Sequence, residues 1–324
     1  MTFRRTTRYA CTAGLFLLTG FALDANASSA SFAANEARLA HPDGKVMVVS
    51  HRDCWKYTAE NSLSGIDKCV ALGVDMVEID VRRTRDGDMV LMHDDTVDRT
   101  TNGHGKVRDL TAREVRSLRQ RAHGGGNEPL TDRHVPTLDE ALDRVKGRIL
   151  VNLDIKDDDI YDAVIARVVA RKMGPQVLVK RSLDTDRDDV RRWGRQLPFS
   201  VVLPITAHGP GAGELIRRCN DLPVVAVELL LGPGTGLDGV ASAARSLSIH
   251  VWVNTLATDV ASHRPMNMSA GHDDVAAQKN PDAAWGWLFD HGVDIIQTDE
   301  PALALDYARK RGLHDDVASR PTGQ

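Results

Sequence analysis

Short apolar runs rich in β-branched residues alternate with helical patterns along most of this chain, and no other feature limits the fold as strongly. Helical patterns such as Ser62–Leu72 and Ile160–Lys172 lie between most of the runs. Alternating strands and helices predict a parallel sheet, because a parallel neighbour needs a long crossover connection. The runs are Val46–Ser50, Met76–Val81, Met89–Met92, Ile149–Ile155, Val177–Val179, Phe199–Ile205, Val224–Leu230, His250–Leu256 and Val293–Thr298.

Nine runs are one too many for an eight-stranded barrel, and one short connection explains the excess. Only residues 82–88 separate the second run from the third, and they contain the hairpin turn signal Asp86-Gly87. The third run is therefore predicted to be an antiparallel flap on the second. Eight strands remain, each with room for a crossover, and the sequence predicts a (β/α)8 TIM barrel. The polar residues 95–140 form an insertion after the flap, and Ala257–Asn280 form a second excursion expected to act as a lid.

The chain begins with the pattern of a secretory signal. Arg4, Arg5 and Arg8 precede an apolar stretch over residues 13–23, and Ala25-Asn26-Ala27 resembles a cleavage site. The stretch is shorter than the ~20 residues that span a bilayer, which favours a cleaved signal over a membrane anchor. We therefore expect a signal peptide over 1–27, a linker over 28–44, the barrel over 45–312, a tail over 313–324, and export to the periplasm or beyond.

Composition excludes some function classes. The 324 residues are 42% apolar and 27% charged, which is typical of a globular protein, and the net charge is −4. Nucleic-acid binding is not expected, because there is no basic excess to neutralise phosphates. Cys54 and Cys69 flank one short loop-to-helix segment and are the favoured disulfide in an oxidising compartment. The alternative is a pair of free thiols buried as small apolar groups.

Carboxylates gather at the predicted carboxyl ends of the strands, where barrel active sites lie. Glu78 and Asp80 share one face of their strand, as do Asn152 and Asp154 of the next, and the intervening residues are apolar. These faces should therefore point into the barrel. The three carboxylates of Glu78, Asp80 and Asp154 would repel each other unless a cation neutralised them. Their oxygens suit one hard divalent ion, Ca²⁺ or Mg²⁺.

Cationic and histidine side chains are predicted at the same end of the barrel. Arg52 and Lys156 suit a phosphate group. His51 and His93 can exchange protons near neutral pH. A metal, two cations and two histidines together favour metal-assisted phosphoryl transfer. Each residue alone is more often structural, but the convergence of so many argues for a site.

Four further residues are weaker candidates for substrate contacts. Lys180 and Glu228 lie on predicted strands and would contact the phosphate and the alcohol, or else form an ion pair inside the barrel. Trp252 shares a strand face with Asn254, and the two are expected to line the headgroup pocket.

At these residues the sequence resembles the glycerophosphodiester phosphodiesterase family, in order from about residue 46 to 305. As a set the motifs are highly specific, although several are weak singly. They are His51-Arg52-Asp53, Ala59-Glu60-Asn61-Ser62, Glu78-Ile79-Asp80-Val81, Arg85-Asp86-Gly87, His93-Asp94-Asp95-Thr96, Asp98-Arg99-Thr100-Thr101, Val135-Pro136-Thr137-Leu138, Asp154-Ile155-Lys156, Val251-Trp252-Val253-Asn254 and Gln297-Thr298-Asp299-Glu300-Pro301.

The resemblance implies a barrel of the phosphatidylinositol phosphodiesterase-like kind with a small inserted subdomain. It implies hydrolysis of a small glycerophosphodiester to glycerol 3-phosphate and an alcohol, with membrane contact only through the substrate. It also implies that Glu60 helps to fix the metal or His51. The remaining roles agree with the assignment above: metal ligands Glu78, Asp80 and Asp154, acid/base residues His51 and His93, and phosphate contacts Arg52 and Lys156.

The sequence departs from the family pattern at a loop position, and two other functions are considered for the same barrel. Asp53 stands where the family usually has glycine, and is expected to contact substrate or metal, or to be solvated. A lysophospholipase D or sphingomyelinase D-like enzyme would use a related barrel, with an apolar rim that Trp55, Trp285 and Trp287 could supply. A non-enzymatic barrel that binds a phosphorylated ligand would lack one of the two histidines, and this chain has both.

Overall fold

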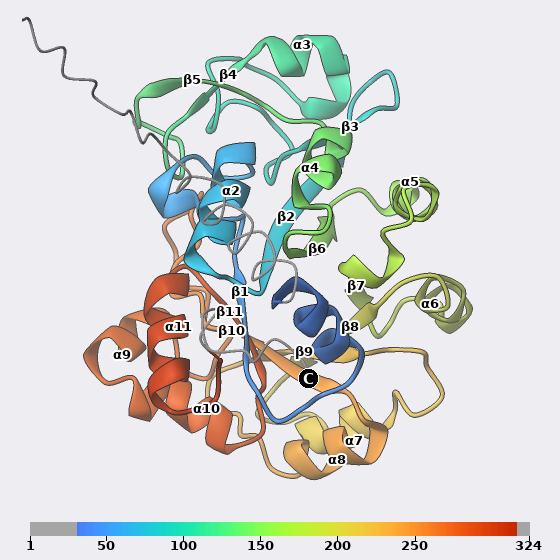
Figure 1. Cartoon of the computed structure of the whole chain (residues 1–324), viewed down its shortest axis with the longest axis vertical. Coiled ribbons are helices and arrows are strands. Elements are labelled where there is room, and N and C mark those ends of the chain that lie inside the picture. The colour runs from blue at the N-terminus through green and yellow to red at the C-terminus, as the bar shows by residue number, and fades with distance from the viewer. Residues whose placement is uncertain (1–30, 316–324) are drawn as a thin grey trace, which may run out of the picture.

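Parallel strands form a closed barrel in the computed structural model, which describes residues 31–315. Within that range eight strands pair in the order β1, β11, β10, β9, β8, β7, β6 and β2, and β1 also pairs with β2, which closes the ring (Figure 1). The predicted TIM barrel is confirmed. The strands are β1 (Met47–Ser50), β2 (Met76–Arg83), β6 (Leu150–Ile155), β7 (Val177–Ser182), β8 (Phe199–Ile205), β9 (Ala226–Leu231), β10 (His250–Asn254) and β11 (Ile295–Thr298).

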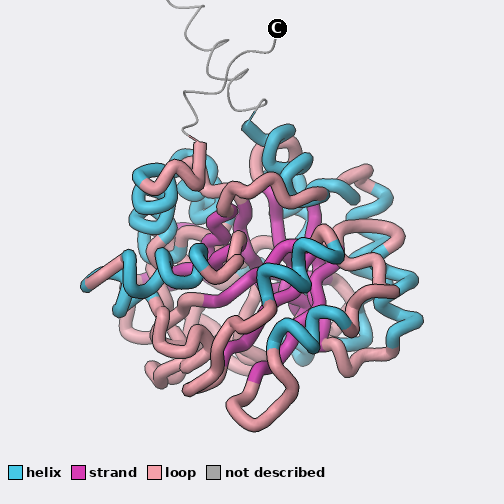
Figure 2. The backbone as a smooth tube through the Cα atoms, turned by 90° about the horizontal axis from the view of Figure 1, so that it is seen from below, coloured by secondary structure: helices cyan, strands magenta, loops and turns pink. Residues whose placement is uncertain are grey.

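Helices surround the strands, which occupy the centre of the molecule (Figure 2). Each barrel strand is followed by helix, so every parallel pairing has its crossover. Capping residues mark several starts: Thr137 and Glu140 form a capping box at α4, and the Ser62 hydroxyl accepts from the Gly65 N–H at α2. The helices that follow the strands are α2 (Leu63–Leu72), α4 (Leu138–Val145), α5 (Tyr161–Ala170), α6 (Arg187–Gly194), α7 (Ala212–Arg217), α8 (Val240–Leu247), α9 (Asp274–Lys279), α10 (Trp287–Asp290) and α11 (Pro301–Lys310).

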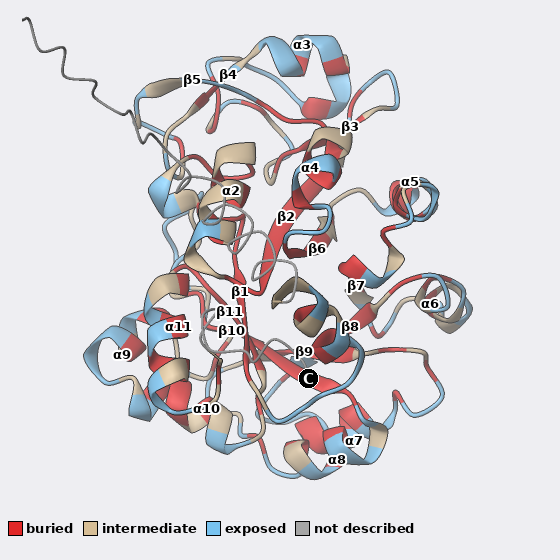
Figure 3. Cartoon of the chain, viewed as in Figure 1, coloured by how far each residue is buried: buried red, intermediate tan, exposed pale blue. Residues whose placement is uncertain are grey.

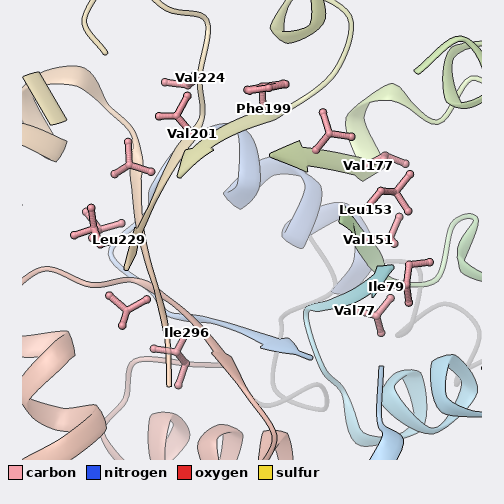
Figure 4. Close-up of a cluster of buried hydrophobic side chains, with 14 of the residues drawn as sticks. Val77, Ile79, Val151, Leu153, Val177, Phe199, Val201, Val224, Leu229 and Ile296 are labelled. Carbon is pink, nitrogen blue, oxygen red and sulfur yellow. The ribbon is translucent and has the colours of Figure 1, made fainter. Parts of the chain in front are cut away.

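Apolar side chains on the outer face of the strands form the main core. Ile79, Leu153 and Leu229 are among those that point outward from the barrel in Figure 4, toward the surrounding helices. The strands themselves are buried almost throughout (Figure 3). Because neighbours along a strand alternate between faces, the outward Ile79 leaves Glu78 and Asp80 inside the barrel, as predicted.

The flap and the insertion also follow the prediction. Strand β3 (Met89–Leu91) pairs antiparallel with the end of β2. Gly87, at φ +84°, takes the left-handed conformation that the connecting turn requires. The insertion contains α3 (Ala112–Ser117) and the small sheet of β4 (Arg119–Arg121) and β5 (Leu130–His134). It ends before residue 140, because α4 starts at Leu138 and packs on α2 as a barrel helix.

The expected linker over 28–44 is wrong where the structure describes it, because residues 31–40 form a helix. The Leu39 side chain is fully buried against Met47, Leu150 and Trp252 at the amino-terminal floor of the barrel. The Arg38 carbonyl also accepts a hydrogen bond from His250 Nε2, at 2.8 Å. The helix therefore closes the barrel floor, and its burial comes from the barrel rather than from a long apolar stripe of its own.

The two chain ends extend the domain beyond the predicted limits. The Val46 N–H donates to the Leu313 carbonyl, and His314 Nε2 lies 2.9 Å from Asp75 Oδ2, so residues 313–315 pack against the barrel instead of forming a tail. The predicted signal peptide and the rest of the tail lie outside the described residues.

Cys54 and Cys69 form a disulfide, the pairing that the sequence favoured. No helix within residues 31–315 is long and apolar enough to cross a membrane.

Candidate active site

Three carboxylates converge inside the carboxyl end of the barrel. The parallel register places Asp80 of β2 beside Asp154 of β6, with Glu78 two residues below Asp80. One oxygen from each of Glu78, Asp80 and Asp154 lies within 4.8 Å of the others. Glu78 and Asp80 are each only 1% exposed. Carboxylates this close together, two of them buried and Asp154 partly exposed, fit a hard divalent cation with oxygen ligands.

The electrostatics of this carboxylate cluster also favour a cation. Burial and the neighbouring Asp80 raise the pKa of Glu78 to about 8. Burial would raise the pKa of Asp80 as well, but Lys156, His93 and Arg52 lower it well below its usual range. Additional positive charge, such as a bound cation, would therefore favour the ionised form of Glu78.

Lysine and arginine side chains lie beside the cluster. Lys156 Nζ is 2.9 Å from both Asp80 Oδ1 and Asp154 Oδ2. Lys180 Nζ is 3.0 Å from Glu228 Oε2 and 4.0 Å from Asp154 Oδ2. The backbone of Arg52 has a positive φ of +47°, and its guanidinium is buried. The Arg52 Nε has no hydrogen-bond partner within residues 31–315. A phosphate oxygen would satisfy such a donor.

His51 is held by a carboxylate from the other end of the chain. Its Nδ1 lies 2.9 Å from Asp299 Oδ1, which also accepts from Trp55 Nε1 at 2.7 Å. The Asp299 backbone N–H donates in turn to Asp274 Oδ2. With Nδ1 donating to Asp299, Nε2 is the nitrogen left for chemistry. Burial lowers the pKa of His51 even though Asp299 opposes this effect, so the neutral base is favoured near pH 7.

His93 has a similar arrangement on the flap side of the barrel. It follows β3 by two residues, and its Nδ1 lies 2.9 Å from Asp94 Oδ1. Its side chain is 29% exposed, so it is more accessible to solvent than His51.

One cavity of about 740 Å³ brings these groups together. Asp259, Met266 and Met268 of the second excursion line it too, so that excursion forms part of the cavity wall. Barrel ends of this kind place several chemical groups around one substrate. The predicted residues that line the cavity are His51, Arg52, Glu78, Asp80, His93, Asp154, Lys156, Lys180 and Glu228.

Comparison with known proteins agrees with this geometry. Residues 51–190 match the model of the glycerophosphoryl diester phosphodiesterase family. This part of the chain is similar to that family. Residues 217–308 match a second model, described as a domain of unknown function.

Curated relatives of the family match only part of the chain. A glycerophosphodiester phosphodiesterase of Caldanaerobacter subterraneus is 39% identical over 113 residues, which cover 35% of this chain and 46% of that protein. One from Bacillus subtilis is 30% identical over 158 residues, which cover 46% and 53%. The chain thus spans about half the length of these curated relatives.

Solved structures support the same fold over most of the chain. A glycerophosphoryl diester phosphodiesterase from Parabacteroides distasonis has a TM-score of 0.66 at 21% identity, covering 89% of this chain and 94% of its own. An Oleispira antarctica phosphodiesterase in complex with the product sn-glycerol-3-phosphate has a TM-score of 0.59 at 20% identity, covering 82% and 97%.

Two residues expected at the site lie elsewhere. Glu60, which the family resemblance assigned to the metal or His51, lies outside the carboxylate cluster and contacts Arg52 and Arg99 instead. Trp252 is fully buried and is not a cavity-lining residue, because it lies one layer deeper on β10, in the floor cluster. Its Nε1 donates to Asn254 Oδ1, and Asn254 reaches the cavity. Lys180 and Glu228 form the interior ion pair and also line the cavity.

Sequence reasoning missed Asn61 and Asp299 and misjudged Asp53. Asn61 Nδ2 donates to Asp80 Oδ2 at 2.7 Å, and Asn61 Oδ1 accepts from the Asp80 N–H. Its signal was its place in a family motif. The signal for Asp299 was its position directly after a barrel strand. Asp53, expected at the substrate, metal or solvent, is fully buried and accepts from the Ser62 N–H.

Proposed function

We propose that the chain is an exported, metal-dependent glycerophosphodiester phosphodiesterase. It would hydrolyse glycerophosphodiesters to glycerol 3-phosphate and an alcohol. The observation that carries this proposal is that His51 and His93, each with Nδ1 on a carboxylate, share one cavity with the Glu78, Asp80 and Asp154 cluster. The names of the curated relatives and the product bound in the Oleispira antarctica neighbour support this substrate class.

The role proposed for each group follows from its charge and its position in the cavity. A divalent ion, Ca²⁺ or Mg²⁺, held by Glu78, Asp80 and Asp154 would supply positive charge to a phosphate oxygen. Arg52 and Lys156 bind and orient the phosphate through charge-assisted hydrogen bonds. One histidine takes the proton of the attacking group, which is either water or the glycerol 2-hydroxyl. Attack by the 2-hydroxyl would give a cyclic phosphate, which water would then open to glycerol phosphate. The other histidine protonates the leaving alkoxide.

The carboxylates that bind the two histidines determine which ring nitrogen of each imidazole carries the proton. Asp299 and Asp94 accept from Nδ1 of His51 and His93, which leaves each Nε2 to exchange a proton with substrate. The lower pKa of buried His51 suits a base, since a neutral imidazole is available near pH 7.

Export is part of the proposal and rests on separate features. Residues 1–27 have the basic, apolar and small-residue segments of a secretory signal. The Cys54–Cys69 disulfide fits a protein that works in the periplasm or outside the cell, where such bonds persist.

The direct test uses purified residues 28–324 and glycerophosphocholine. We expect glycerol 3-phosphate to appear with Ca²⁺ or Mg²⁺ and to disappear with a chelator. His51→Ala and His93→Ala should each lower kcat by roughly 10²–10⁴-fold, the usual contribution of an acid or base. Metal binding measured by calorimetry should persist in both variants.

Other outcomes would redirect the assignment. Cleavage of lysophosphatidylcholine vesicles without cleavage of glycerophosphocholine would favour the lysophospholipase D or sphingomyelinase D-like alternative. Binding of glycerol 3-phosphate without turnover of either substrate would favour a non-enzymatic barrel.

A further inference from the structure

Arg99 of the insertion connects the two sides of the site without lining the cavity. Its Nε and Nη2 donate to Asp94 Oδ2 and Oδ1 at 2.8 and 2.9 Å. Its Nη2 and Nη1 donate to Glu60 Oε1 and Oε2 at 2.7 and 2.8 Å. Nη1 also donates to the Gly124 carbonyl. These contacts use all five N–H groups of a guanidinium, so Arg99 bridges two carboxylates with paired hydrogen bonds to each.

Each bridged carboxylate also holds a residue of the proposed active site. Asp94 Oδ1 lies 2.9 Å from His93 Nδ1. Glu60 Oε2 accepts from Arg52 Nη1 at 3.4 Å. The sequence of contacts therefore runs from His93 through Asp94, Arg99 and Glu60 to Arg52, and joins a proposed acid/base residue to a proposed phosphate contact.

The chemistry of this chain of contacts depends on the central cation. Glu60 is 2% exposed and the Asp94 side chain 18%, so neither charge is well solvated. Burial would raise the pKa of Asp94, but hydrogen bonds from His93 and Arg99 keep it well below its usual range. Without Arg99, two poorly solvated carboxylates would face each other, and one would tend to move or take up a proton.

We infer that Arg99 is a positioning residue, which orients the His93 imidazole through Asp94 and the Arg52 guanidinium through Glu60. The inference rests on the proposed function, because that function gives His93 and Arg52 their roles. An ionised Asp94 accepts from His93 Nδ1 and so keeps the proton-exchanging Nε2 toward the cavity. Small displacements of such groups are costly in rate, which is why a residue outside the cavity can control turnover.

A merely structural role for Arg99 would be to attach the insertion to the barrel, since it also binds the Gly124 carbonyl. Arg167 offers a matched comparison. It also bridges two carboxylates, with Nη1 at 3.0 Å from Asp88 and 3.4 Å from Asp139, but away from the cavity. Substituting Arg167 removes a similar ion-pair bridge without touching the proposed site.

The test compares Arg99→Met with Arg167→Met in the full chain. We expect Arg99→Met to lower kcat on glycerophosphocholine by about 10²-fold with a raised KM, and Arg167→Met to stay within about twofold of wild type. In Arg99→Ala, guanidinium chloride well below denaturing concentrations should restore part of kcat, and it should not change Arg167→Ala. Unaltered kcat and KM in folded Arg99→Met would overturn the inference, as would a loss that guanidinium does not rescue.

A spectroscopic measurement separates this inference from the proposed function. Nitrogen-15 NMR of the imidazoles should show His93 protonated at Nδ1 in wild type, and a shift toward the Nε2-protonated tautomer in Arg99→Met. If wild type turns over no phosphodiester but the tautomer still shifts, the proposed function fails and the positioning role stands. An unchanged His93 tautomer would overturn the inference. If Arg99→Met does not fold, Arg99→Lys replaces it, because one ammonium cannot pair with both carboxylates as the guanidinium does.

Discussion

His51 Nδ1 lies 2.9 Å from Asp299 Oδ1, although 248 residues separate the two in the chain. The contact follows from barrel closure, because Ser50 of β1 pairs with Thr298 of β11. His51 and Asp299 are the residues directly after these two strands. Trp55 Nε1 donates to the same Asp299 oxygen and restrains it further. Asp299 thus selects the imidazole tautomer that the proposed mechanism needs.

Replacing Asp299 by asparagine should remove that selection. We expect Asp299→Asn to lower kcat on glycerophosphocholine by roughly 10²–10⁴-fold with little change in KM, because an amide can donate to Nδ1 and favour the wrong tautomer. Steady-state kinetics provide the measurement. Asp294→Asn is the matched control, since Asp294 makes the same contact with His250 Nδ1, at 2.9 Å, near the barrel floor. Equal kinetics in the two variants would contradict the role of Asp299.

Metal binding should stabilise the fold measurably. Glu78, Asp80 and Asp154 repel each other, and a cation that binds only the folded chain adds about 2.7 kcal/mol when its concentration is 100 times its Kd. We therefore expect Ca²⁺ or Mg²⁺ to raise the Tm of chelator-treated protein in scanning calorimetry. Asp154→Asn should lose most of that rise. Asp159→Asn, an exposed carboxylate paired with Arg83, should keep it; the same loss in both variants would argue against the cluster as the metal site.

The buried carboxyl of Asp53 should make the unfolding free energy fall as pH rises above about 4. Burial raises the pKa of Asp53 well above its usual value, so the folded state binds a proton that the unfolded state has released. Its contribution to the unfolding free energy therefore decreases as pH rises from about 4 through the folded pKa. Asp53→Asn keeps the Ser62 N–H acceptor and tolerates φ +63°. We expect urea denaturation to show a gain over wild type at pH 8 that shrinks toward pH 4.5; a gain independent of pH would assign the effect to backbone conformation instead.

Reducing the Cys54–Cys69 disulfide should weaken the domain next to its proposed site. The bond closes a loop of 15 residues that follows His51 and Arg52 and contains Glu60 and Asn61. Cross-links of this loop length contribute about 3 kcal/mol, chiefly by restricting the unfolded chain. Cys54→Ser/Cys69→Ser should lower the unfolding free energy by that order in urea titrations. Cys219→Ala, at the buried free cysteine, is the control, and identical curves with and without dithiothreitol in wild type would contradict the prediction.

Local patterns were enough to predict the barrel and the carboxylates, cations and two histidines of the proposed site. The apolar residues between Glu78, Asp80 and Asp154 showed which side chains face inward, because alternation along a strand is a property of backbone geometry. The Asp86-Gly87 pair identified the flap, because this pair is typical of tight hairpin turns. Gly87 takes the positive φ that such a turn requires. Family motifs added the order of the sites along the chain.

Depth within the barrel and contacts between distant segments were not visible in these patterns. Trp252 and Asn254 share a strand face, yet only Asn254 reaches the cavity, because the register between neighbouring strands decides the layer. Residues 31–40 read as a linker because their burial depends on the barrel floor that Leu39 contacts.

Short-range patterns were sufficient to predict which residues alternate into the barrel and which turns interrupt the strands, since both depend on neighbours a few residues apart. Tertiary structure alone decided that Asp299 orients His51, that Glu60 binds arginines rather than joining the carboxylate cluster, and that Arg99 joins Asp94 to Glu60. These contacts depend on how the ring closes and where the insertion lies over it. Neither property is encoded in the short-range spacing of the residues involved.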